Sequence, residues 1–351
     1  MGSGGLVWAV TVIVAAAALA AVLVTVRRSR RRATPAGAAA GPEQPPGARP
    51  WVAVVVNPTK ITDLDRETAW LDRHCAAHGL DAARWWQTTV EDPGCEVTRR
   101  ALDEKPCAVL AFGGDGTVRA VASALAGTST PLGILPAGTG NLLARNLSLP
   151  LTDLDAAVEI ALSGRDRKVD VGQVQFDRSG EDHDPVTDTF CVMAGIGFDA
   201  EVMASVGSEL KDRVGWWAYI LEGTRKLSGP RVRVAIRLDE GEVTHRWVRT
   251  VLVGNCGELI GGVPLMPDAE LDDGWLDLAV VAPRGVVGWG AVIATVLTRS
   301  RRGHPVVQHL RARSVEIRAE RPLHVQLDGD PAGTARVLRA TADPLALTVR
   351  Y

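Results

Sequence analysis

The chain has 351 residues, of which 46% are hydrophobic, and its formal net charge at pH 7 is -2. This length accommodates one or two globular domains. The five cysteines are scattered and form no Cys-x-x-Cys pair, which disfavours a disulfide framework and a structural zinc site. Five of the six arginines in the first 50 residues lie within residues 27–32, beside an apolar run. Because no other dense basic run exists, we expect no nucleic-acid partner.

Residues 6–26 form an uncharged, apolar run of 21 residues, which is long enough to cross a bilayer as a helix. The arginines that follow favour a cytoplasmic location for the rest of the chain. We therefore predict a single-pass anchor in the cell membrane over residues 1–32. A cleaved export signal is the alternative, but no positive segment precedes the apolar run.

Residues 33–50 are rich in Ala, Gly and Pro and predict a flexible linker. Strands and helices then alternate, which predicts a three-layer α/β domain over residues 51–164, with a parallel sheet covered on both faces. The predicted strands are residues 51–56, 83–87, 108–111 and 131–135, and the predicted helices are residues 63–78, 95–103, 118–125 and a helix from residue 142. Ligands of such sheets bind at the carboxyl ends of the strands.

After residue 164 the pattern changes to short runs of alternating apolar and polar residues, which predicts an antiparallel β-sandwich domain over residues 165–351. The expected strands are residues 169–174, 190–193, 232–238, 247–253, 276–281, 315–318, 323–327 and 345–349. Two helices are expected near residues 211–227 and 288–299.

The segment Gly113-Gly114-Asp115-Gly116-Thr117 lies where a predicted strand turns into a helix. Backbone N–H groups gather at a helix N-terminus and suit a phosphate. A carboxylate in such a cradle needs a cation between it and the phosphate, which points to a metal–nucleotide complex. The spacing fits neither a P-loop nor a Gly-x-Gly-x-x-Gly motif. Taken alone, the segment is also typical of an ordinary tight turn.

A second glycine turn, Gly138-Thr139-Gly140-Asn141, follows the next predicted strand. Its glycines let the backbone approach phosphate oxygens, and Thr139 offers a hydroxyl. Asn57 and Lys60 follow the first strand and offer further donors, and Thr88 follows the second. All of these turns are expected at the same edge of the sheet.

With Asn57-Pro58-Thr59-Lys60 and residues 132–141, these motifs resemble the diacylglycerol kinase catalytic domain family. That family includes bacterial lipid kinases and the sphingosine and ceramide kinases. The resemblance continues through the second half of the chain and covers residues 51–351 in all. The matching segments there are residues 168–172, 190–199, 267–276 and 326–330.

The resemblance implies ATP and Mg²⁺ as cofactors and gives each motif a role. Asp328 would be the general base, and Asp115 would approach the phosphates through Mg²⁺. A structural Mg²⁺ would be held by Asp273 and the carbonyl oxygens of Glu270 and Trp275. The residues implied in ATP binding are Asn57, Thr59, Lys60, Thr88, Gly113, Gly114, Asp115, Gly116, Thr117, Gly138 and Thr139. From the residues alone, the acidic segment also fits a solvated turn and Asp328-Gly329 fits an ordinary hairpin turn.

Two positions depart from the family pattern. Leu142 stands where the family often has Asp, and Asp330 stands where it usually has Glu. The missing Asp puts one contact to the nucleotide or metal in doubt. The Asp330 carboxylate is one methylene shorter than that of Glu, which leaves its role open.

The sequence therefore predicts a membrane-anchored cytoplasmic lipid kinase that phosphorylates the hydroxyl of a diacylglycerol-like or sphingoid lipid. The expected partners are this lipid and the membrane, and a homodimer is compatible with the sequence. An NAD or polyphosphate-type kinase is one alternative, because it shares a Gly-Gly-Asp-Gly-Thr-like turn. A non-catalytic module that senses nucleotide or lipid is the other, and Leu142 and Asp330 leave it open.

Overall fold

The computed structural model describes residues 49–181, 185–197, 231–259, 263–285, 288, 291–292 and 306–351. All of them belong to one compact unit, residues 40–351. The predicted membrane span at residues 6–26 and the predicted helix at residues 211–227 lie outside the described residues, as does most of the predicted helix at 288–299. Within the part of the chain that is described, no helix is long and apolar enough to cross a membrane.

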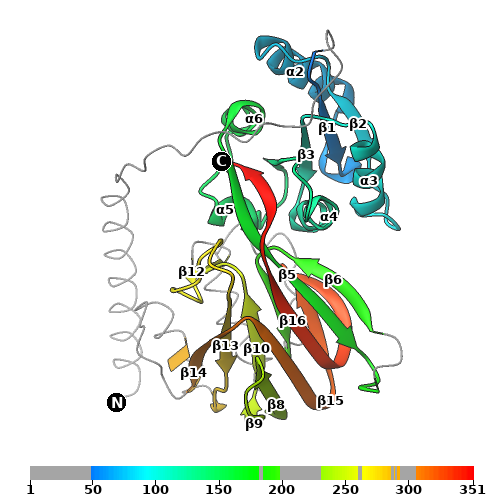
Figure 1. Cartoon of the computed structure of the whole chain (residues 1–351). Coiled ribbons are helices and arrows are strands. Elements are labelled where there is room, and N and C mark those ends of the chain that lie inside the picture. The colour runs from blue at the N-terminus through cyan, green and yellow to red at the C-terminus, as the bar shows by residue number, and fades with distance from the viewer. Residues whose placement is uncertain are drawn as a thin grey trace, which may run out of the picture. The chain divides into compact units, whose positions relative to one another are not determined.

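The first part of this unit is an α/β region built on four parallel strands, as predicted (Figure 1). Their order in the sheet is β4-β3-β1-β2. β1 and β3 are fully buried, which explains why the sequence shows continuous apolar runs there rather than alternation. The strands are β1 (Val52–Val56), β2 (Arg84–Gln87), β3 (Ala108–Gly113) and β4 (Leu132–Pro136).

Helices cover both faces of these strands, which confirms the three-layer prediction. Alternate residues of β1 face opposite cores: Val55 shares a core with Val97 and Val121, whereas Val54 shares one with Leu71 and Val158. The helices are η1 (Pro58–Lys60, a 3-10 turn), α2 (Leu64–Ala77), α3 (Cys95–Asp103), α4 (Asp115–Leu125), α5 (Leu142–Asn146) and α6 (Leu154–Ser163). Thus α3 and α4 cover one face, and α2 and α6 the other.

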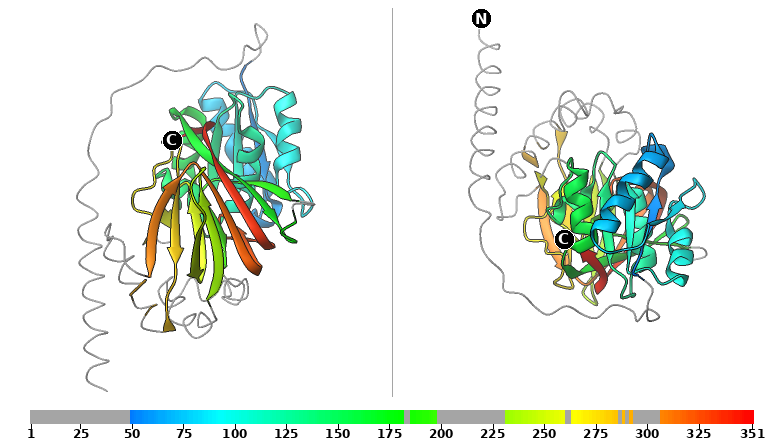
Figure 2. Two further views of the ribbon diagram at one scale, coloured as in Figure 1. Left: turned by 60° about the horizontal axis from the view of Figure 1, so that its bottom comes forward. Right: turned by 90° about the horizontal axis from the view of Figure 1, so that it is seen from above.

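The second part is a β-rich region whose strands pair antiparallel, again as predicted (Figure 2). Many of its buried side chains form an apolar core of their own, whereas others, such as Val171, Leu252 and Ala279, belong to the core that contains the side chains of α3 and α4. The strands are β5 (Asp166–Asp177), β6 (Val186–Phe190), β7 (Met193–Ile196), β8 (Val232–Leu238), β9 (Thr244–Val248), β10 (Thr250–Gly254), β11 (Glu258–Leu259), β12 (Val263–Pro264), β13 (Leu276–Val281), β14 (Val307–Ala312), β15 (Ser314–Leu327) and β16 (Asp330–Arg350).

β16 connects the two regions. It pairs with β15 along its first half and with β5 along most of its length. Near its end, Val349 also pairs in parallel with Leu132 of β4. The α/β strands and most of the β-rich strands therefore belong to one continuous sheet, and the C-terminal residues return to the α/β region.

Four of the predicted strands differ in detail from those observed. Residues 190–193 are not one strand, because the chain leaves β6 after Phe190 and the next three N–H groups donate to the Asp328 carboxylate. Residues 247–253 are divided between β9 and β10 at Arg249. The two runs at 315–318 and 323–327 belong to the single strand β15, which has a register shift between them.

Candidate active site

The two glycine turns lie against each other at the carboxyl ends of β3 and β4. Gly113 pairs with Pro136, and the Ala137 N–H donates to the Gly113 carbonyl at 2.9 Å. A Cβ atom on Gly138 would lie 2.7 Å from the Cα of Gly114, closer than real side chains approach. Only glycine therefore fits at residue 138, and the backbone of both turns stays open to a ligand.

The Asp115 carboxylate joins the two turns. Asp115 is the first residue of α4, and its two oxygens accept the N–H groups of Asn141 at 2.9 Å and Leu142 at 2.5 Å. Asn141 adopts a left-handed conformation with φ 46°, and its side chain bonds back to the Gly138 backbone through both its oxygen and its nitrogen. The two turns consequently form one hydrogen-bonded unit.

Asp115 lies in a negatively charged environment. Burial, helped by the charges of Asp328 and Asp330, raises the pKa of its carboxyl to about 6, although the two backbone hydrogen bonds lower it. Oδ2 of Asp330 lies 2.9 Å from the place that a Cβ atom on Gly116 would take, directly beside the turn. Such a group of carboxylates next to a glycine cradle favours a cation.

Asp328 is the most enclosed of these carboxylates, with an exposed fraction of 4%. Burial raises the pKa of its carboxyl, whereas its hydrogen bonds and the charge of Arg119 lower it. Arg119 of α4 also donates from Nη1 to the Leu327 carbonyl at 2.7 Å, so α4 contacts both the Asp115 turn and the Asp328 turn. The Asp328 carboxylate accepts three successive N–H groups, from Cys191, Val192 and Met193, at 2.8–2.9 Å.

The residues predicted to bind ATP all lie at or just beyond the carboxyl ends of β1–β4. Asn57 Oδ1 accepts the N–H of Thr59 at 3.0 Å and its hydroxyl at 2.7 Å, which fixes the η1 turn. Lys60 is exposed and borders a cavity of about 540 Å³ together with Phe112 and Ala137. Thr88 is buried after β2, whereas Thr139 is exposed. The full set is Asn57, Thr59, Lys60, Thr88, Gly113, Gly114, Asp115, Gly116, Thr117, Gly138 and Thr139.

The acidic segment around Asp273 forms its hydrogen bonds and ion pairs with residues outside the glycine turns. Asp273 accepts the Trp275 N–H at 2.9 Å and forms an ion pair with Arg311. Nε of Arg311 also lies 3.9 Å from Asp277, whose pKa burial raises to about 6. Glu270 is exposed. The guanidinium of Arg311 thus supplies the positive charge between these two carboxylates.

Magnesium therefore fits one of the two predicted places better than the other. At the glycine turns, Mg²⁺ would need only one or two carboxylates beside the phosphates, and Asp115 and Asp330 meet that requirement. At the acidic segment, Arg311 pairs with the Asp273 carboxylate. Among the residues that the structure describes, no group of three His, Cys, Asp or Glu side chains is arranged to hold a metal ion. The predicted set of the Asp273 carboxylate and the carbonyl oxygens of Glu270 and Trp275 stays a prediction beside this ion pair.

Sequence reasoning missed three features of the site. Arg119 lies four residues after Asp115, so helical spacing from the glycine turn was the available signal. Asp170 is buried and accepts the N–H groups of Gly274 at 2.6 Å and Leu345 at 2.7 Å, which holds the acidic segment in place. The strand break at residues 191–193 carries no sequence signal, because the run there is simply apolar.

Comparisons with known proteins agree with this arrangement. The family described as "Diacylglycerol kinase catalytic domain" matches residues 52–174, and the family described as "YegS C-terminal NAD kinase beta sandwich-like domain" matches residues 192–351. A diacylglycerol kinase of Staphylococcus carnosus is 30% identical over 239 residues, which are 67% of this chain and 74% of that protein. A probable lipid kinase YegS-like of Pseudomonas fluorescens is 33% identical over 256 residues, 72% of this chain and 80% of that protein.

Solved structures share the fold. A crystal structure of a diacylglycerol kinase from Bacillus anthracis aligns with a TM-score of 0.62 at 22% identity. The alignment covers 86% of this chain and 97% of that one, so both the α/β and the β-rich regions have counterparts.

Proposed function

Because the chain belongs to the diacylglycerol kinase catalytic domain family and is a lipid kinase, we propose that it phosphorylates the hydroxyl of a diacylglycerol-like or sphingoid lipid, with Mg-ATP as the donor. The observation that carries the proposal is the direct contact between the two glycine turns, closed by Asp115. This contact offers open backbone for a triphosphate beside carboxylates that favour a cation.

On the donor side, the backbone of Gly113–Thr117 and of Gly138 and Thr139 would contact the phosphates. Asn57, Thr59, Lys60 and Thr88 lie at the ends of the adjoining strands and would contact the rest of the nucleotide. Asp115 and Asp330 would hold Mg²⁺, which when bound neutralises charge on the phosphates. With a pKa of about 6 the Asp115 carboxyl is mostly ionised at neutral pH, and a bound cation would favour that form further.

On the acceptor side, we assign Asp328 the role of general base, which accepts the proton of the lipid hydroxyl. Burial raises its pKa, which makes the carboxylate a stronger base, and three backbone N–H groups hold it in one orientation. Asp330 is the second candidate, because it is exposed and lies beside the same glycine turn. The position of both on the turn between β15 and β16 supports an acceptor site opposite the ATP phosphates.

A lipid panel tests this proposal. The purified full-length protein would be incubated with labelled ATP, Mg²⁺ and detergent micelles that contain diacylglycerol, monoacylglycerol, sphingosine or ceramide. We expect labelled phosphate on at least one of them. Label on NAD in a lipid-free reaction, with none on any lipid, would identify the alternative kinase. ATP binding without transfer to any acceptor would favour a non-catalytic module.

A further inference from the structure

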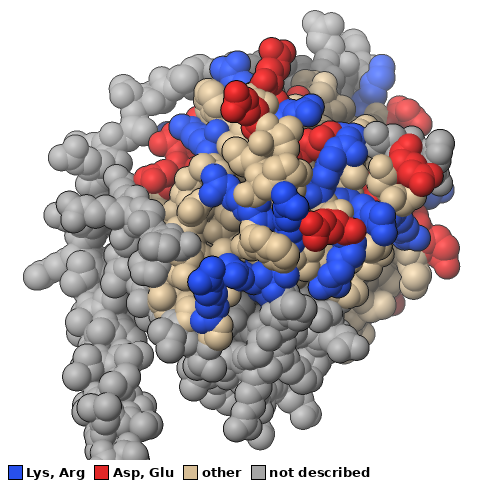
Figure 3. Space-filling view, turned by 90° about the horizontal axis from the view of Figure 1, so that it is seen from below, with Lys and Arg blue, Asp and Glu red and all other residues tan. Residues whose placement is uncertain are grey.

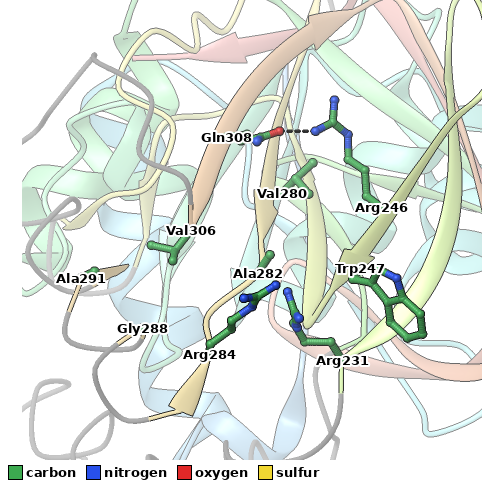
Figure 4. A pocket seen from close by; sticks show the side chains of 10 residues that line it. All are labelled: Arg231, Arg246, Trp247, Val280, Ala282, Arg284, Gly288, Ala291, Val306 and Gln308. Atoms are coloured by element: carbon green, nitrogen blue, oxygen red, sulfur yellow. Dashed lines mark hydrogen bonds between the residues drawn. The ribbon is translucent and has the colours of Figure 1, made fainter.

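A second cavity lies in the β-rich region, away from the glycine turns (Figure 4). Its volume is about 620 Å³, which is in the range of small-molecule sites. β9, β13 and β14 contribute to its walls, together with residues just before β8 and just after β13. Its arginines are Arg231, Arg246 and Arg284, and Val280, Ala282 and Val306 contribute apolar surface.

The strand register separates this cavity from the candidate active site. The Asp328 N–H donates to the carbonyl oxygen of Met193 on β7. Met193 pairs with Gly254 on β10, and Gly254 pairs with Asp277 on β13. Val280 and Ala282 lie three and five residues beyond Asp277 along the same strand direction. At roughly 3.3 Å per residue, the cavity lies about 10–16 Å along the strands from the level of Asp328. It is therefore not the place of phosphoryl transfer.

Among the described residues, no carboxylate neutralises the positive charge of the cavity. None of the residues that line it is acidic, and within the described part of the chain neither Arg231 nor Arg284 forms an ion pair. Arg246 donates from Nη1 to Gln308, but its Nε is buried and has no hydrogen-bond partner among the described residues. By contrast, Arg318 and Arg339 are both paired with Glu316. The cavity thus has free donors for an anion.

The surroundings of the cavity point to a lipid rather than to a soluble anion. Trp247 lies at its edge and is 55% exposed, which is unusual for so large an apolar side chain. Trp is enriched where proteins meet the membrane interface, and Arg binds phosphate through several donors at once. Figure 3, which views the molecule from below, shows many Lys and Arg side chains across this face with fewer acidic ones among them. Such a face is attracted to an anionic bilayer.

We propose that the cavity binds the phosphate headgroup of an anionic phospholipid in the bilayer. Arg231, Arg246 and Arg284 contact the phosphate, the apolar wall contacts the glycerol backbone and upper acyl chains, and Trp247 enters the membrane interface. This site docks the β-rich region on the membrane that holds the acceptor. The inference rests on the proposed lipid-kinase function for its biological setting, but binding is measured without any turnover.

The test is lipid binding by the full-length protein in neutral detergent, measured by native mass spectrometry. The probes are phosphatidylglycerol, phosphatidylcholine and inorganic phosphate. We expect the Arg231→Gln/Arg284→Gln variant to bind phosphatidylglycerol at least about 10-fold more weakly than the unmodified chain, since two of the three phosphate contacts are lost. The matched control is Arg237→Gln/Arg321→Gln, which removes the same charge from two exposed arginines that do not line the cavity. This control should keep its affinity.

Three results would overturn the inference. Equal losses in both double variants would mean that only net charge attracts the lipid. Phosphatidylcholine bound as tightly as phosphatidylglycerol would exclude recognition of an anionic headgroup, and inorganic phosphate bound as tightly would make the site one for a soluble anion. Because ATP and acceptor lipid are absent, a failed kinase assay would leave this binding result unaffected, and the two proposals fail separately.

Discussion

The Asp115 turn (residues 113–117) and the Asp328 turn (between β15 and β16) each hold an acidic side chain through backbone N–H groups. The N–H groups come from different parts of the chain in the two cases. Asp115 receives them from Asn141 and Leu142, which lie 26 and 27 residues later at the end of the neighbouring parallel strand. Asp328 receives them from residues 191–193, which are 135–137 residues earlier and lie where β6 ends and β7 begins. The first site is a local property of the sheet edge, and the second depends on the assembled β-rich region.

The two turns also differ in what they leave open. The Asp115 turn is built from glycines, whose missing side chains expose backbone to a ligand. The Asp328 turn encloses its carboxylate almost completely. Helix α4 connects them, because Asp115 begins it and Arg119 bonds to the carbonyl that precedes Asp328. Changes at the Asp115 turn should therefore affect nucleotide binding, whereas changes at the Asp328 turn should affect proton transfer.

The largest effect is expected where the glycine turns touch. In Gly138→Ala the new methyl group would lie 2.7 Å from the Gly114 Cα, so the turns must separate and the phosphate cradle is lost. We expect kcat/KM for ATP to fall by at least about 100-fold, as one misplaced ångström near the chemistry can cause. Steady-state kinase assays with varied ATP would measure it.

Gly114→Ala is the matched stability control for this change. A Cβ atom there would meet only the Gly138 Cα, at the ordinary distance of 3.5 Å. Urea unfolding should show Gly138→Ala destabilised by roughly 1–3 kcal/mol and Gly114→Ala by clearly less. Equal stabilities and an unchanged KM for ATP in Gly138→Ala would mean that the contact between the turns does not shape the nucleotide site.

A smaller effect is expected when α4 is uncoupled from the Asp328 turn. Arg119→Gln removes a charge that lowers the pKa of the Asp328 carboxyl. The acid limb of the pH profile of kcat should move to higher pH. At a pH on this limb, kcat should fall about tenfold for each pH unit of the shift. Arg119→Lys, which retains the charge, should move the limb back. A pH profile that is identical in all three proteins would separate Arg119 from the chemistry.

Asp277 offers a test by pH that concerns stability alone. Burial raises the pKa of its carboxyl from 3.8 to about 6, so the charged form is disfavoured in the folded protein. The resulting penalty is complete above pH 6 and disappears as the pH falls toward 3.8. Asp277→Asn should therefore raise the free energy of unfolding at neutral pH, by at most about 3 kcal/mol, and this gain should shrink in acid. A constant difference across the pH range would contradict the raised pKa.

The smallest effect is expected from removing magnesium in the absence of ATP. Since Arg311 already compensates Asp273, replacing Mg²⁺ with EDTA should change Tm by no more than about 1 °C. Differential scanning calorimetry would decide the matter. A Tm that rises by several degrees with Mg²⁺, and no longer does so in Asp273→Asn, would instead restore the structural magnesium site predicted from the sequence.

Much of the fold follows from the sequence because its signals are local. The apolar runs of β1 and β3 and the helix from residue 95 to 103 match prediction closely, since burial on both faces and helical spacing appear directly in the residue order. The sequence predicted antiparallel pairing in the second region, but it did not predict the lengths of the longest strands there. The 21 residues of β16 pair with several partners in turn, and its bend at Leu345 leaves no clear periodic pattern.

The same distinction applies to the site. The glycine turns could be assigned to one sheet edge, because strand order alone brings them together. The ion pair between Arg311 and Asp273 could not be predicted, because Arg311 lies on β14, a strand that the sequence did not indicate. Likewise, nothing at residues 191–193 reveals that their N–H groups donate to the Asp328 carboxylate.

The central claim is that Asp328 accepts the proton of a lipid hydroxyl opposite ATP bound at the glycine turns. The most direct measurement compares kcat for lipid phosphorylation and Kd for Mg-ATP in Asp328→Asn, with Asp330→Asn beside it and thermal unfolding as the fold control. We expect Asp328→Asn to lower kcat by roughly 10²–10⁴-fold while Kd changes less than about threefold. A folded Asp328→Asn protein that keeps its turnover would contradict the claim. A loss of kcat confined to Asp330→Asn, with Kd for Mg-ATP unchanged, would transfer the role to Asp330.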